Sequence, residues 1–430
     1  MHRFTRLAVL VAAGALAAGC TAGDQAGDDT GTASTDSTAP TVPSGPAPGV
    51  TDDSIEVGVT FVDLAAIGDI ATLDHGDYEA AYQALFDDIN AEGGINGRTI
   101  DATIIGVNPV GTDSADAACV QLTEDEGVFA VMGFMNADAP ICVVGTHQTA
   151  LIGGAMTPSR LEQAEAPWFS ADASADLQTE TIRAMAEAGV FDGATLGIYG
   201  TSTEQAQIDD EVLPLLDELG VDVTETIVPD FDNTDITASN AAVQTASERF
   251  SSSGVDTLLL VGDSGLGWAT GVESTDYRPR LLLTSPSSIK AWATDPAGHD
   301  LSVLDGAIGG NVYGPNQNIW ELPQMQECIQ IVEDAGVPVP EPDSVPEDEG
   351  AVYLAGMDAC RSVTLFRALV EAAGDELDYG TLAAAADGLE VQLPDQPEPV
   401  TYGPPPHADG DLPAYLYDWD PDLVDFALQD

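Results

Sequence analysis

The stretch Asp88-Ile89-Asn90-Ala91-Glu92-Gly93-Gly94-Ile95-Asn96-Gly97-Arg98 marks the point where a predicted helix gives way to a predicted strand. Before it, apolar residues recur at three- and four-residue spacing (Tyr78, Tyr82, Leu85, Ile89), which predicts one buried face of a helix over about 77–91. The pair Gly93-Gly94 ends this helix. Apolar runs at 55–61 and 100–106 flank it as candidate strands. A strand, a helix and a second strand in this order predict a parallel sheet.

The same alternation continues along the chain. Further strands are predicted at 128–134, 150–154, 194–199, 221–228, 257–261 and 280–284, and further helices at 114–122, 175–188, 204–219, 236–250 and 266–273. Two successive α/β halves predict two lobes with a cleft between them. Because ligands bind beyond the carboxyl ends of parallel strands, we expect the site in the loops that follow Phe61, Phe134, Gly154, Tyr199 and Val261.

Several segments resemble one known family. The helix ending at 88–98, the opening strand 55–59 with the loop 66–69, and the late segments Tyr402-Gly403-Pro404 and Asp409-Gly410-Asp411 are similar to type I periplasmic (solute-) binding proteins of ABC transporters. The similar branch is that of the leucine/isoleucine/valine-binding proteins, and the resemblance covers residues 53–425. It implies an α/β fold of two doubly wound parallel-sheet lobes, joined by a three-crossing hinge that closes on a ligand.

The resemblance also implies how the chain is divided and what it does. It assigns 53–171 and 306–413 to lobe 1, and 172–305 and 414–430 to lobe 2. It also implies that helices at about 323–335 and 350–373 flank the sheet of lobe 1. The implied function is capture of a small polar ligand for an ABC permease and its ATPase, the ligand being a branched-chain or other amino acid or a related amide or carboxylate. The alternative is a ligand-sensing module that reports to a membrane receptor. We expect no enzymatic activity, no cofactor and a monomer.

The first twenty residues, MHRFTRLAVLVAAGALAAGC, have the basic start and short apolar run of a secretory signal. The apolar run is shorter than the ~20 residues that span a membrane as a helix. Its ending Ala17-Ala18-Gly19-Cys20 resembles the bacterial lipoprotein signal, which implies removal of 1–19 and lipid on Cys20. The alternative is an ordinary secreted protein with a chance cysteine. Residues 20–52 are expected to form a flexible linker, so we predict an exported protein anchored at the outer face of the cell membrane.

The composition is strongly acidic. The 430 residues include 73 Asp and Glu but 11 Lys and Arg, for a formal net charge of −62. Nucleic acid is excluded as a partner because phosphate binding needs clustered basic side chains. An anionic membrane surface would repel such a chain unless a covalent anchor held it. Charge repulsion at this density opposes folding and is screened by salt, from which we infer a salt-rich habitat. The alternative is an acidic secreted protein that needs only solubility.

Four cysteines remain once Cys20 carries lipid, and an exported chain lies where disulfides form. Four cysteines allow three pairings. Cys119 lies on the second predicted helix and Cys142 on the third, and these helices share a face in a doubly wound lobe. Cys328 and Cys360 lie on the two long helices of the later segment. We therefore predict the bonds Cys119–Cys142 and Cys328–Cys360, and no metal site, because no C-x-x-C spacing occurs.

Ligand contacts are expected from the first lobe. In the resembled family the ligand carboxylate is held there by hydroxyls and backbone N–H groups at helix starts, a position that suits an anion. This implies Thr157 as the first donor, followed by Asn136 with Ala137. The alternative for Thr157-Pro158 is a turn with a helix cap. Asp63, in the loop after the first strand, is a further candidate.

Ligand contacts are also expected from the second lobe. An ammonium group needs an acidic partner there, and Asp263 directly follows the predicted strand 257–261. Tyr199, Thr201 and Ser202 end an earlier strand and would line the opposite wall. Because the chain holds 73 acidic residues, a solvated or capping role for Asp263 is the alternative.

Three motifs of other protein classes are set aside. Gly262-Asp263-Ser264-Gly265 resembles the nucleophile segment of trypsin-like proteases, but it lacks the context of a histidine base. Gly265-Leu266-Gly267 lacks the third glycine of a dinucleotide fingerprint at the right spacing. Asp418, Asp420 and Asp422 alternate as in a calcium loop, whose Gly and Glu positions hold Leu423 and Gln429 here. We interpret all three as structural.

Overall fold

The computed structural model describes residues 45–67, 74–109, 112–136, 138–154, 156, 158–170, 177–202, 204–229, 236–293, 298–311, 319–346, 350–403 and 414–428. The predicted signal peptide, Cys20 and the linker up to residue 44 lie outside these ranges. So does the segment Asp409-Gly410-Asp411. Within the ranges, no helix combines the length and the apolarity that a membrane span requires.

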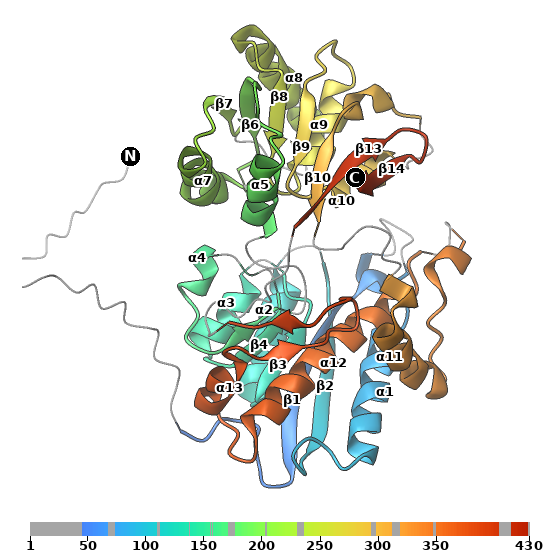
Figure 1. Cartoon of the computed structure of the whole chain (residues 1–430). Coiled ribbons are helices and arrows are strands. Elements are labelled where there is room, and N and C mark those ends of the chain that lie inside the picture. The colour runs from blue at the N-terminus through green and yellow to red at the C-terminus, as the bar shows by residue number, and fades with distance from the viewer. Residues whose placement is uncertain are drawn as a thin grey trace, which may run out of the picture. The chain divides into compact units, whose positions relative to one another are not determined.

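The first sheet is parallel, with the strand order β2-β1-β3-β4-β5 (Figure 1). Its strands are β1 (Ser54–Val62), β2 (Thr99–Val107), β3 (Ala130–Gly133), β4 (Ala150–Gly153) and β5 (Trp168–Phe169). The helices between them are α1 (Tyr78–Ala91), α2 (Asp113–Val120), α3 (Ala139–Ile141) and α4 (Pro158–Leu161). The four strands predicted in this region are confirmed. The fifth, β5, has two residues and was not predicted.

The stretch 88–98 performs the predicted change from helix to strand. Gly94 has a φ of +77°, and a Cβ there would lie 1.9 Å from the carbonyl oxygen of Arg98, so the turn needs glycine. The side chain of Asn90 bonds both backbone groups of Ile100, accepting from its N–H (2.7 Å) and donating to its carbonyl (2.9 Å). The end of α1 is thereby fixed to the start of β2.

Both faces of the first sheet are buried. Along β3, Ala130 and Met132 belong to the core that α1 covers, and Val131 between them belongs to the core on the other face, beside α2 and α3. The alternation follows from strand geometry, in which successive side chains point to opposite faces of the sheet. It explains why the strands appear in the sequence as continuous apolar runs.

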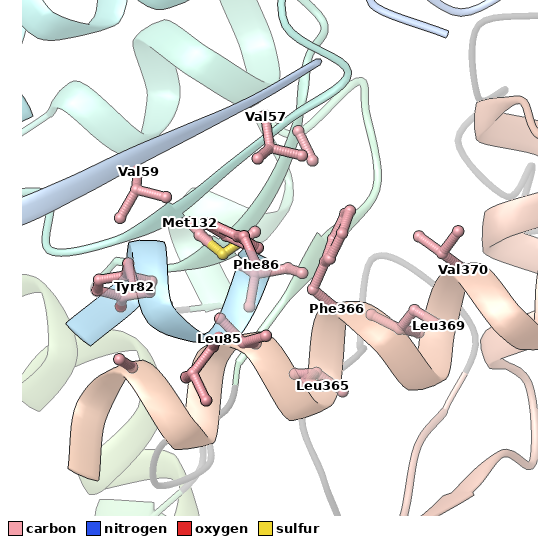
Figure 2. Close-up of a cluster of buried hydrophobic side chains, with 14 of the residues drawn as sticks. Val57, Val59, Tyr82, Leu85, Phe86, Met132, Leu365, Phe366, Leu369 and Val370 are labelled. Carbon is pink, nitrogen blue, oxygen red and sulfur yellow. The ribbon is translucent and has the colours of Figure 1, made fainter. Parts of the chain in front are cut away.

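Helices from late in the chain complete this core. They are α11 (Pro323–Asp334), α12 (Leu354–Ala373) and α13 (Tyr379–Ala386), followed by the short strands β11 (Glu390–Val391) and β12 (Val400–Thr401). Figure 2 shows α12 beside α1, with Leu365 and Phe366 near Leu85 and Phe86, and with Leu369 further along α12 beside Val370. The prediction that the helices near 323–335 and 350–373 flank the first sheet is confirmed.

The second sheet has the order β14-β13-β10-β9-β8-β6-β7, in which β13 pairs antiparallel with β10 and with β14. Its strands are β6 (Leu196–Tyr199), β7 (Val223–Ile227), β8 (Thr257–Leu260), β9 (Arg280–Leu283), β10 (Ile308–Asn311), β13 (Tyr415–Asp420) and β14 (Asp425–Leu428). Its helices are α5 (Leu177–Glu187), α6 (Gln205–Gln207), α7 (Leu213–Glu218), α8 (Ile236–Ser253), α9 (Ser264–Val272) and α10 (Ser287–Ala293).

Strand β10 corrects one predicted boundary. The family resemblance assigned residues from 306 onward to the first lobe, but Ile308 and Gly309 pair in parallel with β9 of the second sheet. The strand contains Gly309 and Gly310, so it lacks the apolar pattern of the other strands. Gly310 is required because a Cβ there would lie 2.2 Å from Cγ2 of Thr181 on α5. Because α5 packs closely on this strand, β10 contains glycines in place of the apolar residues from which a buried strand is normally predicted.

Both predicted disulfides are confirmed. Cys119 at the end of α2 is bonded to Cys142 just after α3, with an S–S distance of 2.07 Å. Cys328 on α11 is bonded to Cys360 on α12, with an S–S distance of 2.01 Å. Each bond joins two helices that cover the same face of the first sheet.

Candidate functional site

A cavity of about 600 Å³ lies at the carboxyl ends of four strands of the first sheet. These ends belong to β1, β3, β4 and β5, and the rest of the wall comes from α1 and α12. The lining residues are Thr60, Phe61, Val62, His75, Tyr78, Tyr82, Gly133, Phe134, Met135, Gly153, Gly154, Met156, Ser170, Leu354, Asp358, Arg361 and Ser362. The cavity lies at three of the five loops where the sequence predicted the site, those after Phe61, Phe134 and Gly154.

Glycines form the floor of the cavity. Gly133 ends β3 with a φ of +103°, and a Cβ there would lie 2.1 Å from the carbonyl oxygen of Thr60 on β1. Gly153 ends β4 in the same way, with a φ of +109° and a Cβ position 2.7 Å from the carbonyl oxygen of Gly133. L side chains rarely adopt this backbone conformation. The strand ends therefore stay close together and leave space above them.

Aromatic rings form one wall. The ring of Phe61 at the end of β1 stacks on Tyr78, with centroids 5.4 Å apart and an interplanar angle of 17°. Tyr82 lies one turn further along α1, and Phe134 follows β3. Asp77 caps α1 by accepting from the N–H of Ala80 (3.0 Å), which fixes the first turn and so the position of Tyr78.

Polar side chains gather at the other end of the cavity. The hydroxyl of Tyr78 donates to Oδ2 of Asp358 on α12 (3.0 Å), and Nδ1 of His75 lies 3.3 Å from that hydroxyl. Arg361, one turn after Asp358, has its Nη1 3.8 Å from Asp358 Oδ1. Its Nε lies 2.7 Å from Oδ2 of Asp395, whose side chain is 1% exposed. The guanidinium is therefore held between two carboxylates.

The surroundings set the protonation of two of these groups. Burial raises the pKa of the Tyr78 hydroxyl well above its ordinary value, and the charge of Asp358 raises it further. The hydroxyl therefore remains a donor at every physiological pH. Burial lowers the pKa of His75, against the opposing effect of the charges on Asp358 and Asp74. The imidazole is therefore neutral at pH 7.

The loop that carries His75 is attached to the start of α12. The N–H of Ala355 donates to the carbonyl of His75 (2.8 Å). Gly76 has a φ of +89°, and a Cβ there would lie 2.2 Å from the carbonyl oxygen of Val352. This close approach brings two distant parts of the chain into one polar group, in which the hydrogen bond between Tyr78 and Asp358 joins residues 280 positions apart.

Sequence reasoning missed His75, Tyr78, Asp358 and Arg361 as site residues. Tyr78 was assigned to the buried face of its helix, and α12 was treated only as a flank of the sheet. One signal was available. Asp358 and Arg361 are opposite charges three residues apart, so they lie on one face of a helix that is otherwise apolar around them. Charges on a core-facing helix surface need a partner or a ligand.

The predicted residues of the first lobe do not line the cavity where they are described. Oδ1 of Asp63 accepts from the N–H of Ala65 (3.1 Å), so this side chain stabilises the turn after β1. Asn136 donates to the carbonyl of Pro109 (3.2 Å) and links the loops that follow β3 and β2. Ala137 and Thr157 lie outside the described residues.

The predicted residues of the second lobe lie at the ends of β6 and β8, which are neighbours in the second sheet. Tyr199 is 1% exposed and packs on Trp268 with centroids 4.9 Å apart, so it is a core residue and not a wall. Thr201 bonds Glu204 through its N–H (2.7 Å) and its hydroxyl (2.6 Å). Ser202 and Asp263 are exposed, and Asp263 accepts from the hydroxyl of Ser285 (3.0 Å).

The other motifs serve local structure. The hydroxyl of Ser264 is buried and donates to the carbonyl of Tyr199 (3.4 Å). Oδ1 of Asp420 accepts from the N–H groups of Asp422 and Leu423 in the turn before β14. Cys119, Cys142 and His147 place their ligand atoms within 4.8 Å of one another. Both sulfurs are joined in the disulfide, so neither is a thiolate that could bind a metal.

Comparison with known proteins shows what this fold is similar to. A family described as periplasmic binding protein matches residues 66–422. No curated protein shows a significant match. Among solved structures, a solute-binding protein of an ABC transporter from Rhodopseudomonas palustris, in complex with p-hydroxybenzoic acid, is 17% identical. The match covers 88% of this chain and 96% of that one, with a TM-score of 0.60.

Two further solved structures have the same fold. An ABC transporter substrate-binding protein from Desulfitobacterium hafniense in complex with leucine is 14% identical, covers 88% of this chain and 100% of its own, and has a TM-score of 0.57. A branched-chain amino acid transporter substrate-binding protein from Streptococcus pneumoniae in complex with isoleucine is 13% identical, with coverages of 87% and 98% and a TM-score of 0.54. At these identities the likeness concerns the fold.

Proposed function

The chain belongs to the periplasmic binding protein family, and we propose that it captures a small ligand outside the cell and delivers it to an ABC importer. The family is one of binding proteins, which agrees with the prediction that the chain is not an enzyme. The observation that carries the proposal is the cavity at the strand ends of the first sheet, which combines an aromatic wall with a charged end.

The proposed mechanism is hinge closure. A ligand seated in the first-sheet cavity would gain further contacts from the ends of β6 and β8, where Thr201, Ser202 and Asp263 lie. The closed state is favoured by as much as the ligand binds it better than the open one. We place the crossings between the two lobes at 170–177, 311–319 and 403–414, the segments that connect elements of one sheet with elements of the other.

The proposed location follows from the start of the sequence. The predicted linker 20–52 is too long at its end, because Ala47 packs in the first core and the carbonyl of Thr51 accepts from Arg98 (2.8 Å). Lipid on Cys20 would hold the chain at the outer face of the membrane, and the remainder of the linker, 20–44, would let the folded part reach a permease. The partners would be that permease with its ATPase, and the chain would act as a monomer.

A ligand screen tests the proposal. We expect at least one small molecule among leucine, isoleucine, 4-hydroxybenzoate, amides and amines to raise the thermal midpoint of the purified protein. A ligand at 100 times its Kd stabilises the fold by ~2.7 kcal/mol, which corresponds to several degrees at roughly 2–4 °C per kcal/mol. If the purified protein shows a cooperative unfolding transition but no compound of the panel raises its thermal midpoint, the proposal is contradicted.

A blocking variant locates the binding. Ser362 lines the cavity from α12, so Ser362→Trp fills the cavity and should abolish the shift. Ser252→Trp, at an exposed position near the end of α8, is the matched control and should retain it. If the shift persists in Ser362→Trp, the ligand binds elsewhere.

A further inference from the structure

We propose that the cavity takes a small organic cation, with the carboxylate of Asp358 as its counter-charge and the rings of Phe61, Tyr78 and Phe134 as its apolar walls. This inference rests on the proposed function, because it names the chemical class of ligand for the same cavity.

The charge balance at the polar end is negative. Arg361 is the only Lys or Arg in the described lining, and its Nε contacts Asp395 at 2.7 Å while Nη1 lies 3.8 Å from Asp358. One guanidinium thus faces two carboxylates, and the neighbouring His75 is neutral at pH 7. Together, Asp358, Asp395 and Arg361 carry one net negative charge. A cationic ligand would balance this charge, whereas a ligand carboxylate would add to it.

The start of α1 does not offset this charge. An N-terminus favours anions through its free N–H groups and its dipole. At α1, however, the carboxylate of Asp77 already accepts from the N–H of Ala80, and Asp74 accepts from the N–H of Gly76 (2.8 Å). The carboxylate of Asp77 thus already occupies a donor that an anion at the start of α1 would use.

The other basic side chains are bound elsewhere. Arg160, the one closest in sequence to the strand-end loops, lies 3.3 Å from Asp138. Arg98 donates to the carbonyls of Thr51 and Asp375, and Lys290 lies 2.7 Å from Asp425. Arg361 is therefore the one side chain of Lys or Arg that lines the described cavity, and an anionic ligand would need at least one more to balance its charge.

The walls suit a cation that carries apolar groups. A cationic nitrogen is attracted to the face of an aromatic ring, an effect that grows from ~0.5–1 kcal/mol at exposed sites to about 2 kcal/mol when water is excluded. Phe61 and Tyr78 are stacked at one side, and Met135 and Met156 add polarisable surface. The hydroxyl of Tyr78 holds the Asp358 carboxylate beside these rings.

Three probes that share a phenylethyl group and differ in charge test the proposal. Phenethylamine is cationic, 2-phenylethanol is neutral and 3-phenylpropionate is anionic at pH 7, and titration calorimetry measures the Kd of each. We expect the amine to bind about tenfold or more tightly than the other two. Asp358→Asn should remove this preference while the alcohol binds unchanged, because asparagine retains an acceptor for Tyr78. A cavity that prefers the propionate, or does not bind the amine at millimolar concentration, overturns the proposal.

A matched control separates the local charge from the total charge. Asp87→Asn removes one charge from an exposed position on α1, outside the cavity, and should leave the preference for the amine intact. If both variants reduce it equally, the effect comes from the overall charge and the proposal fails. If leucine or 4-hydroxybenzoate binds with no dependence on Asp358, the inference fails while the proposed function stands. If no molecule of the wider screen binds, both fail.

Discussion

At the scale of single residues, Arg361 has a structural role, since it pairs with Asp395 and its charge is therefore not available to balance an anionic ligand. Its guanidinium lies beside Asp395, a carboxylate 1% exposed, and a buried charge without its partner is costly. The residue therefore stabilises the packing of α12 on the loop after β11. This explains how a charged residue can line the cavity and yet leave the cavity negative.

His75 makes stability depend on pH. Burial lowers its pKa in the folded chain, so between that lowered value and the ordinary value near 6.5 the unfolded state binds more protons. Its contribution to the free energy of unfolding is therefore complete above about pH 6.5 and is lost as the pH falls below it. We expect His75→Gln to lose less stability than the natural chain between pH 7.5 and 5.5 in urea unfolding. The difference should stay under about 1 kcal/mol because the ring is half-buried. Identical losses in the two proteins would contradict this assignment.

At the scale of elements, the disulfide between Cys328 and Cys360 joins the two long helices that cover the first sheet. It closes a loop with a sequence separation of 32, which restricts the unfolded chain by about 3–4 kcal/mol. We expect Cys328→Ala with Cys360→Ala to lower the free energy of unfolding by that amount under oxidising conditions. The bond Cys119–Cys142, with a separation of 23, serves as the comparison and should contribute slightly less. A loss under 1 kcal/mol in both double variants would show that the bonds do not act through the unfolded chain.

The elements also show what a sequence can predict. Strands buried on both faces, such as β3 and β8, appear as apolar runs and were predicted to within a few residues. Strand β10 was not, because its glycines are dictated by α5 packing on them. The same holds for the site. Its location at strand ends follows from the topology. The spacing of Asp358 and Arg361 signals that these charges need a partner, but the partner Tyr78 is supplied by the docking of α12 beside α1, a tertiary contact that the spacing does not specify.

At the scale of the whole molecule, the charge of −62 sets the conditions in which the fold is stable. The acidic residues outnumber the 11 basic ones so far that most have no cation to pair with, and their mutual repulsion opposes the compact state. The Debye length shortens from about 10 Å at 0.1 M salt to about 3 Å at 1 M. Screening therefore removes repulsion in the folded chain, where the charges lie closer together, more than in the unfolded one. We expect the thermal midpoint to rise by several degrees between 0.1 and 2 M KCl, and to rise less in sucrose of matched osmolality. A midpoint that stays constant or falls with KCl would mean that the acidic surface serves solubility alone, and that the inference of a salt-rich habitat is wrong.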